Sequence, residues 1–211
     1  MTESQRQAYA ALAQMDPDLG RLIDQCGTPD PFEFHDGGRT SGSNFAGMSL
    51  HILGQQISTT VAFLLYDRLT DATGDTPTAK SVLGLGQDSI KALGTSRSKA
   101  GYLLNLAEHV DSGVLDIENM GGLSDDDAIQ ALVAVTGIGV WSAEMFLIHQ
   151  LHRADIFPAG DVGLRKALKR LNGSVEIPSV AAAHETGRHW RPFRTYAAAI
   201  LWRSLTVPDE V

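Results

Sequence analysis

A pair of glycines and a later aspartate are the residues whose spacing suggests chemistry. Within Leu132–Leu164, the motif Thr136-Gly137-Ile138-Gly139 separates two apolar-periodic segments, and Asp161 follows 22 residues after the second glycine. Two glycines around one apolar residue permit a tight turn with positive φ, and the apolar residue fixes that turn to the core. The N–H groups of the turn and of the next helix's first turn are expected to point outward without partners, where they suit a phosphate oxygen. When the motif is taken alone, a plain helix–helix turn is the favoured explanation.

Asp161 stands where a turn leads into a helix. Pro158 and Gly160 predict the turn, and the apolar periodicity resumes at Val162. Aspartate is a common N-cap residue, which is the ordinary explanation for its presence. A carboxylate held at the mouth of a binding site, facing a substrate, is the functional explanation. The residues alone leave both open.

The elements that must position these residues are predicted to be helices. Apolar residues recur three and four positions apart in Tyr9–Ile23, Phe45–Leu69, Ala100–Val110, Ala128–Val135, Val140–Leu151, Val162–Leu171, Val180–Trp190 and Tyr196–Leu205. Ser124, before three aspartates, and Ser179 are predicted N-caps. Asp30–Gly42 is predicted to be a loop and Asp71–Pro77 a polar connection. With no alternating strand pattern, we expect an all-α fold.

Charge is distributed unevenly along the chain. The formal net charge is −8, and residues 1–150 hold 8 basic and 19 acidic residues. Residues 163–203 instead hold 8 basic residues against 2 acidic ones. Phosphate affinity depends on the local field, so this basic segment permits nucleic-acid binding without demonstrating it. An ordinary solvated basic helix face is the alternative.

Several classes of protein are excluded by composition. Cys26 is the only cysteine, which excludes a disulfide framework, a Cys-ligated zinc site and an iron–sulfur cluster held by four thiolates. His149, His152, His184 and His189 show no metal-ligand grouping beyond helical spacing. No apolar run is long enough to cross a bilayer, so no membrane partner is expected. We expect a cytoplasmic, nucleoid-associated monomer.

Four blocks, in order, resemble the helix–hairpin–helix (HhH-GPD) DNA glycosylase superfamily. The blocks are Leu53-Gly54-Gln55-Gln56-Ile57-Ser58, the segment Leu93–Leu106, the hairpin with Asp161, and the tail Trp190–Tyr196 ending at Trp202. The branch that the chain resembles most is 3-methyladenine DNA glycosylase II. The resemblance implies a helical fold of two lobes with a cleft between them. One lobe is expected from residues 1–42 with about 163–211, and the other from about 43–162.

The resemblance also implies an activity on double-stranded DNA that contains damaged bases. Members that nick the backbone carry a lysine two residues after the second hairpin glycine, where this chain has Trp141. Water is then the expected nucleophile, and no Schiff base with the sugar forms there. Asp161 is expected to stabilise the cation that develops at the sugar as an alkylated base leaves. A monovalent cation, Na⁺ or K⁺, at the hairpin carbonyls is implied as well.

The resemblance assigns further residues to the base pocket and to DNA contacts. The flipped base is expected to meet Trp202, Trp141, Met145 and Phe45, although core packing explains an aromatic residue on a helix equally well. DNA contacts are expected from Thr136, Gly137, Ile138, Gly139, Arg97, Ser98, Lys99, Gln55, Gln56 and Arg165. Arg97 is the expected wedge residue, with an exposed basic residue at a helix start as the alternative. Gln55 and Gln56 either read the opposite strand or cap and bridge helices.

Two alternatives to alkylated-base excision remain at this stage. Met145 stands where the family commonly has tyrosine, so a deaminated or oxidised base is a second candidate substrate. A helix–hairpin–helix DNA-binding module without catalysis is the third candidate. The aspartate at the family spacing and the excess of acidic residues both argue against that module.

Overall fold

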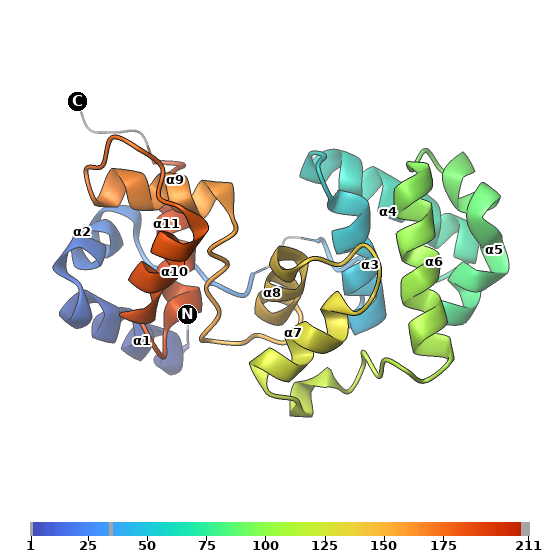
Figure 1. Ribbon diagram of the computed structural model, residues 1–211, viewed down its shortest axis with the longest axis horizontal. Helices are drawn as coiled ribbons and strands as arrows, with labels where there is room; N and C mark the ends of the chain where they lie inside the picture. The colour runs from blue at the N-terminus through green and yellow to red at the C-terminus, as the bar shows by residue number, and fades with distance from the viewer. Residues whose placement is uncertain (1, 34–35, 208–211) are drawn as a thin grey trace. The chain divides into compact units, whose positions relative to one another are not determined.

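A computed structural model describes residues 2–33 and 36–207. These residues form eleven α-helices and one short 3₁₀ helix, without a strand, which confirms the all-α prediction (Figure 1). The chain divides into two compact units, with unit 1 formed by residues 1–33 and 152–211 and unit 2 by residues 34–151. Both boundaries precede those predicted at 42 and near 162. Residues 34 and 35 of the predicted loop, and the predicted lobe's residues 1 and 208–211, lie outside the described residues.

Unit 1 is a bundle of five helices from the two ends of the chain. They are α1 (Glu3–Met15), α2 (Pro17–Cys26), α9 (Val162–Leu171), α10 (Val180–Arg188) and α11 (Arg194–Ser204). Helix α11 packs against the other four, as Figure 1 shows. Seven consecutive residues of α11 are buried, which places it at the centre of the unit's apolar core. The N-caps predicted at Ser124 in unit 2 and Ser179 in unit 1 are confirmed.

The apolar pattern over Tyr9–Ile23 belongs to two helices rather than to one. Helix α1 ends at Met15, and Asp16 is the N-cap of α2, with its Oδ1 accepting hydrogen bonds from the N–H groups of Asp18 and Leu19. Pro17 follows at the first helical position, where a missing N–H costs nothing. The Oδ2 atom of Asp16 also accepts a hydrogen bond of 2.9 Å from the indole of Trp190, so this cap ties α2 to the turn that follows α10.

Unit 2 is built around α3 (Asn44–Gly54). The other helices are α4 (Thr59–Thr73), α5 (Ala79–Ala92), α6 (Arg97–Asp111), the 3₁₀ helix η1 (Met120–Gly122), α7 (Asp125–Val133) and α8 (Val140–His149). Eight residues of α3 are buried, and the helix packs against α4, α6 and α8. The carboxylate of Glu118 accepts hydrogen bonds from the N–H groups of Asn44 and Phe45 at the start of α3. None of the described helices has the length and apolar character to span a membrane.

Two predicted boundaries in unit 2 were wrong. The pattern Phe45–Leu69 is interrupted by a turn at residues 55–58, and α4 continues to Thr73, into the segment predicted as a connection. Helix α5 was not predicted, and its residue Gly86 has a non-helical φ of 71°. The glycines of this helix weaken the helical signal in the sequence, because glycine is a poor helix former.

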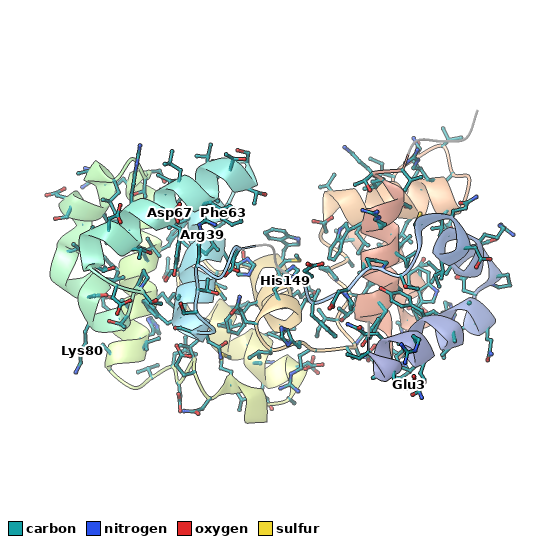
Figure 2. The ribbon with its side chains drawn as sticks, turned by 180° about the vertical axis from the view of Figure 1, so that it is seen from behind. Glu3, Arg39, Phe63, Asp67, Lys80 and His149 are labelled. Atoms are coloured by element: carbon teal, nitrogen blue, oxygen red, sulfur yellow. The ribbon has the colours of Figure 1, made fainter. Side chains whose placement is uncertain are left out.

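The described part of the loop before α3 is held to α4 by Arg39. Its guanidinium forms an ion pair with Asp67, at 2.7 Å, and lies 4.6 Å from the ring centroid of Phe63. Figure 2 shows the three side chains together. The loop therefore approaches α3 in a defined position.

Candidate active site

The hairpin lies between α7 and α8, where the sequence predicted it. Gly137 has a φ of 96°, and a Cβ atom there would lie 2.1 Å from the ring of Tyr102. Ile138 is 3% exposed and fixes the turn to the core, as expected. Only glycine satisfies both the backbone angle and the close approach of the tyrosine ring.

The hairpin N–H groups are less open than predicted. The N–H of Thr136 donates to Asn105 Oδ1 at 2.8 Å, and the N–H of Ile138 donates to the carbonyl of Val135 at 3.1 Å. These two groups therefore have partners inside the protein, contrary to the prediction. The start of α8 is different, because its N-cap residue is the exposed Gly139, which has no side chain to cap the helix. An uncapped helix N-terminus is a favourable place for an anion.

Gln55 joins the turn after α3 to the hairpin. Its Nε2 donates to the carbonyl oxygen of Gly137 at 2.9 Å and lies 3.5 Å from Ser142 Oγ. Of the two roles that the sequence left open for Gln55, bridging is the one seen here.

Gln56 is exposed and has a φ of 58°. A non-glycine residue in the left-handed region carries backbone strain, which concentrates at functional positions. This conformation could not be predicted from the sequence, since no glycine marks it.

The turn between α5 and α6 carries the predicted wedge. Ser96 is the N-cap of α6, and Arg97 and Ser98 are exposed in its first turn. The Nζ of Lys99 donates to the carbonyl of Leu53 at the end of α3, at 2.7 Å. Burial lowers the pKa of Lys99. This lysine therefore links α6 to the turn that carries Gln56.

Three residues that the sequence did not single out organise the same region. Arg68 donates from NH1 to the carbonyl of Leu93, at 2.8 Å, and so holds the turn before Arg97. Tyr102 and Asn105 both support the hairpin from α6. They are three residues apart, so a search of one helix face for groups near the hairpin would have found them.

Asp161 is confirmed as the N-cap of α9. Its Oδ1 accepts hydrogen bonds from the N–H of Leu164, at 2.7 Å, and from the indole Nε1–H of Trp202, at 3.1 Å. Gly163 leaves room for this arrangement, because a Cβ atom there would lie 3.0 Å from the same oxygen. The carboxylate is half-buried, so it is oriented by the protein and still reachable from solvent.

The other predicted pocket and contact residues differ in exposure. In unit 2, Trp141 is 41% exposed, Met145 is half-buried and Phe45 is 3% exposed inside the core. In unit 1, Trp202 is half-buried, and Arg165 donates from NH1 to the carbonyl of Pro178, at 3.2 Å. The candidate residues thus form two groups, with Asp161, Trp202 and Arg165 in unit 1 and the rest in unit 2.

Two of the four histidines considered in the sequence, His149 and His152, pack against other rings. His149 is stacked on His51, with ring centroids 6.1 Å apart, and His152 lies 5.3 Å from Phe32. Burial, and then the neighbouring His149, lower the pKa of His51 to about 3. Among the described residues, no three His, Cys, Asp or Glu side chains are grouped to hold a metal ion.

Known proteins match this chain along most of its length. Residues 50–192 match the model of the HhH-GPD superfamily base excision DNA repair proteins. The DNA-3-methyladenine glycosylase 1 of Schizosaccharomyces pombe is 30% identical over 161 residues, which cover 75% of this chain and 71% of that protein. The DNA-3-methyladenine glycosylase of Bacillus subtilis is 27% identical, and the match spans 76% of this chain but only 57% of that protein.

Solved structures agree with the sequence matches. The S. pombe 3-methyladenine DNA glycosylase in complex with abasic DNA has a TM-score of 0.85 and 26% identity, covering 97% of this chain and 99% of that one. A DNA-3-methyladenine glycosidase from Bacillus halodurans has a TM-score of 0.80 and 28% identity, covering 93% of this chain and 88% of that one. The chain therefore belongs to the HhH-GPD superfamily of base excision DNA repair proteins.

Proposed function

We propose that this chain is a monofunctional DNA glycosylase that excises alkylated bases, of the 3-methyladenine and 7-methylguanine type, from double-stranded DNA. The observation that carries the proposal is the Asp161 carboxylate at the N-terminus of α9, oriented by the indole of Trp202. The two relatives and two solved structures named above, all of them 3-methyladenine glycosylases by name, support this substrate class.

The chemistry is hydrolysis of the bond between the base and C1′ of deoxyribose. The base leaves with the bonding electrons, and positive charge develops on the sugar. The carboxylate of Asp161 stabilises that charge and accepts a proton from the water that adds to C1′. An alkylated purine is already cationic, so it leaves without a separate general acid.

The base must first be unstacked and turned into a pocket. Contacts with the flipped base are proposed for Trp202 in unit 1 and for Trp141 and Met145 in unit 2, and Phe45 was the fourth residue expected from the sequence. The exposed ring of Trp141 supports its part, since an electron-rich aromatic face attracts a cationic base. Phe45 is 3% exposed inside the core, which argues against direct contact with the base.

Strand cleavage is not expected to accompany base release. The position that carries a lysine nucleophile in the lyase members holds Trp141 here, and an indole forms no Schiff base with the sugar.

The DNA face of unit 2 is proposed to include the hairpin, the turn at Gln55 and Gln56, and the first turn of α6. The uncapped start of α8 supports phosphate binding there. The wedge is proposed to be Arg97, with the exposed and strained Gln56 as the competing candidate. Arg165 is proposed to contact a phosphate through the guanidinium atoms that do not hold Pro178.

A monovalent cation at the hairpin remains a proposal. The carbonyl oxygens of Gly137 and Gly139 each accept one hydrogen bond, and a carbonyl has a second lone pair, so these residues fit such a cation. Replacing Na⁺ and K⁺ by choline at constant ionic strength is expected to weaken binding to duplex DNA. A monomer in the cytoplasm, associated with the nucleoid, is likewise proposed.

The test is release of 3-methyladenine and 7-methylguanine from methylated DNA by the wild type and by Asp161→Asn. Asparagine retains the side-chain oxygen that caps α9 but lacks the charge that stabilises the sugar cation. We expect release by the wild type, almost none by the variant, and nicks only after alkali treatment. Near-normal release by Asp161→Asn would overturn the catalytic role of Asp161.

The same assay addresses the alternatives. Release of deaminated or oxidised bases alone would change the substrate class and keep the mechanism. Duplex binding without release of any base would leave a DNA-binding module.

A further inference from the structure

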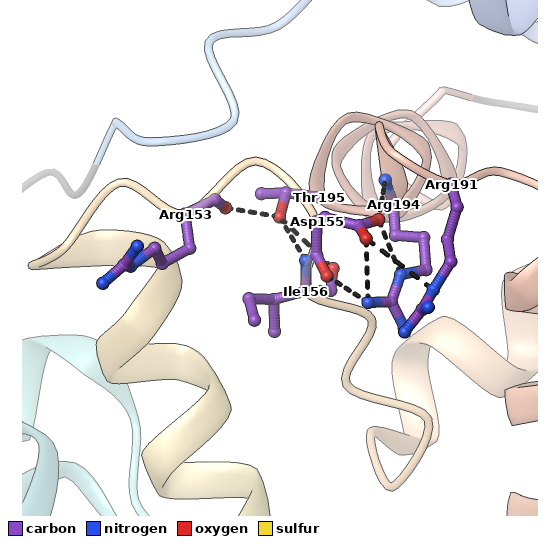
Figure 3. A network of polar contacts seen from close by, with 6 residues as sticks. All are labelled: Arg153, Asp155, Ile156, Arg191, Arg194 and Thr195. Carbon is purple, nitrogen blue, oxygen red and sulfur yellow. Dashed lines mark hydrogen bonds and ion pairs between the residues drawn. The ribbon is translucent and has the colours of Figure 1, made fainter. Parts of the chain in front are cut away.

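Besides the hydrogen bonds at Asp161 itself, a polar network in unit 1 holds the beginning of the segment that leads to Asp161. The guanidinium of Arg194 donates to Asp155 from Nε to Oδ1, at 2.7 Å, and from NH2 to Oδ2, at 3.1 Å (Figure 3). The same NH2 group also donates to the Asp155 carbonyl. Arg194 is only 11% exposed, and a two-pronged contact with a carboxylate fixes both distance and orientation.

Thr195, the next residue of α11, holds the same segment through three further hydrogen bonds. Its hydroxyl donates to the carbonyl of Arg153, at 2.6 Å, and accepts from the N–H of Ile156, at 3.0 Å. Its own N–H donates to the carbonyl of Ala154, at 3.1 Å. Thr195 is fully buried, so four consecutive residues from 153 to 156 are tied to the start of α11.

The segment between this network and Asp161 has little freedom to absorb a shift. Ile156, Phe157 and Ala159 are 3–4% exposed, and the ring of Phe157 packs on Trp190 at 5.5 Å. The N–H of Asp161 closes the last turn onto the carbonyl of Pro158, at 2.8 Å. Close packing transmits a displacement rather than absorbing it.

The far end of the segment is held by the same helix. Trp202 lies seven residues after Thr195, two turns along α11 or about 10 Å, and its indole donates to Asp161 Oδ1. Helix α11 thus contacts the segment 153–161 at both ends.

We propose that the Asp155–Arg194 pair is a positioning element for base excision, because it sets where α11 holds the segment that ends in Asp161. The proposal rests on the proposed function. Neither residue is proposed to touch DNA or the reacting atoms.

The experiment compares Asp155→Asn and Arg194→Lys with the wild type. Lysine keeps the charge of Arg194 but lacks the planar guanidinium that contacts both carboxylate oxygens, so Arg194→Lys tests geometry rather than charge. It is also less prone to misfold than a variant that removes the charge. The matched control is Glu185→Gln, which breaks the exposed Arg188–Glu185 pair in the same unit.

We expect kcat to fall by about tenfold to a hundredfold in both test variants, since small misplacements of catalytic groups have effects of this size. KM, abasic-DNA affinity and the control's kcat should stay close to those of the wild type.

A second measurement is independent of activity. The Nε1–H signal of Trp202 in a ¹⁵N–¹H spectrum, assigned by its loss in Trp202→Phe, reports the hydrogen bond to Asp161. We expect it to shift in Asp155→Asn and to stay in place in the control. If both test variants keep the wild-type kcat, or if the indole signal does not move, the positioning role is wrong. If the wild type releases no base at all, the proposed function fails while the indole signal still decides the positioning role.

Discussion

At the scale of single residues, Gly137 and Gly139 provide a matched pair. Gly137 has a positive φ and lies against Tyr102. Gly139 has a φ of −90°, and a Cβ atom added there would have no atom of another part of the chain within 4 Å. We expect Gly137→Ala to lower the free energy of unfolding by about 2 kcal/mol or more, since it strains the backbone and collides with a ring. Urea unfolding followed by circular dichroism measures this loss.

Gly139→Ala is the control and should cost less than about 1 kcal/mol. Equal losses in the two variants would mean that the hairpin tolerates any small residue at Gly137, and that the Tyr102 contact does not determine its conformation.

Two roles are proposed for Trp202, and substitution separates them. Trp202→Phe keeps an aromatic face for the base but removes the N–H donor to Asp161. We expect excision to slow by about tenfold, the value of one hydrogen bond to a charged group, and Trp202→Ala to be much slower still. Single-turnover base release measures both rates. Equal rates for wild type and Trp202→Phe would assign the indole N–H no part in orienting Asp161.

Individual site residues could be predicted from the sequence to different degrees. Asp161 as an N-cap and Ile138 as a buried anchor follow from local rules, and both are confirmed. The contact of Lys99 with the end of α3 could not be predicted, because its partner lies 46 residues away. No local rule specifies such a contact.

At the scale of elements, the cap at Asp161 made a boundary predictable, whereas the cap at Asp16 was missed and internal glycines hid a whole helix. Helix α9 begins and ends as predicted, with Asp161 before it. Helix α5 was missed because glycines interrupt its apolar pattern. The cap of α3 by Glu118 also had no local signal, since the two lie more than 70 residues apart.

The packing of α3 on α8 brings His51 and His149 together and predicts a pH dependence. The pKa of His51 is lowered to about 3 in the folded chain, first by burial, whereas an unfolded histidine binds a proton near pH 6.5. As the pH falls from about 6.5 towards 3, the unfolded chain takes up a proton that the folded chain does not, so the free energy of unfolding decreases. His51→Gln should make this decrease with pH shallower in urea unfolding measured between pH 7 and 4.

The exposed His184 on α10 offers the control for this measurement. His184→Gln should leave the slope close to that of the wild type. A wild-type slope in His51→Gln would show that other groups cause the loss of stability in acid.

At the scale of the whole molecule, net charge is unevenly divided between the two units. Unit 2 has six basic and 13 acidic residues, a net charge of −7, although it carries the hairpin. Arg97 is one of those six basic residues and stands beside Lys99 in the first turn of α6. A unit with this net negative charge repels duplex DNA except where basic side chains are close together. Binding should therefore depend on few phosphate contacts.

Arg97→Ala is expected to weaken binding to a duplex with an abasic-site analogue and to reduce the slope of log K against log[salt] by about 1. Lys80→Ala is the control, because Lys80 is exposed on α5 of the same unit and is not assigned to the DNA face (Figure 2). Fluorescence anisotropy at several salt concentrations measures both slopes. Identical slopes for the two variants would remove Arg97 from the interface and leave Gln56 as the wedge candidate.

The assembly of unit 1 from both ends of the chain has a consequence for biosynthesis. A nascent chain that has reached residue 151 has all of unit 2 but only residues 1–33 of unit 1. Asp161 emerges later, and the residues of α11 that hold its segment, Arg194, Thr195 and Trp202, emerge later still. Domains fold as units during synthesis, so the turns of unit 2 that are proposed to face DNA form on the ribosome well before the carboxylate is held in place. A truncated translation product would then resemble a DNA-binding fragment and lack the means to cut a glycosidic bond.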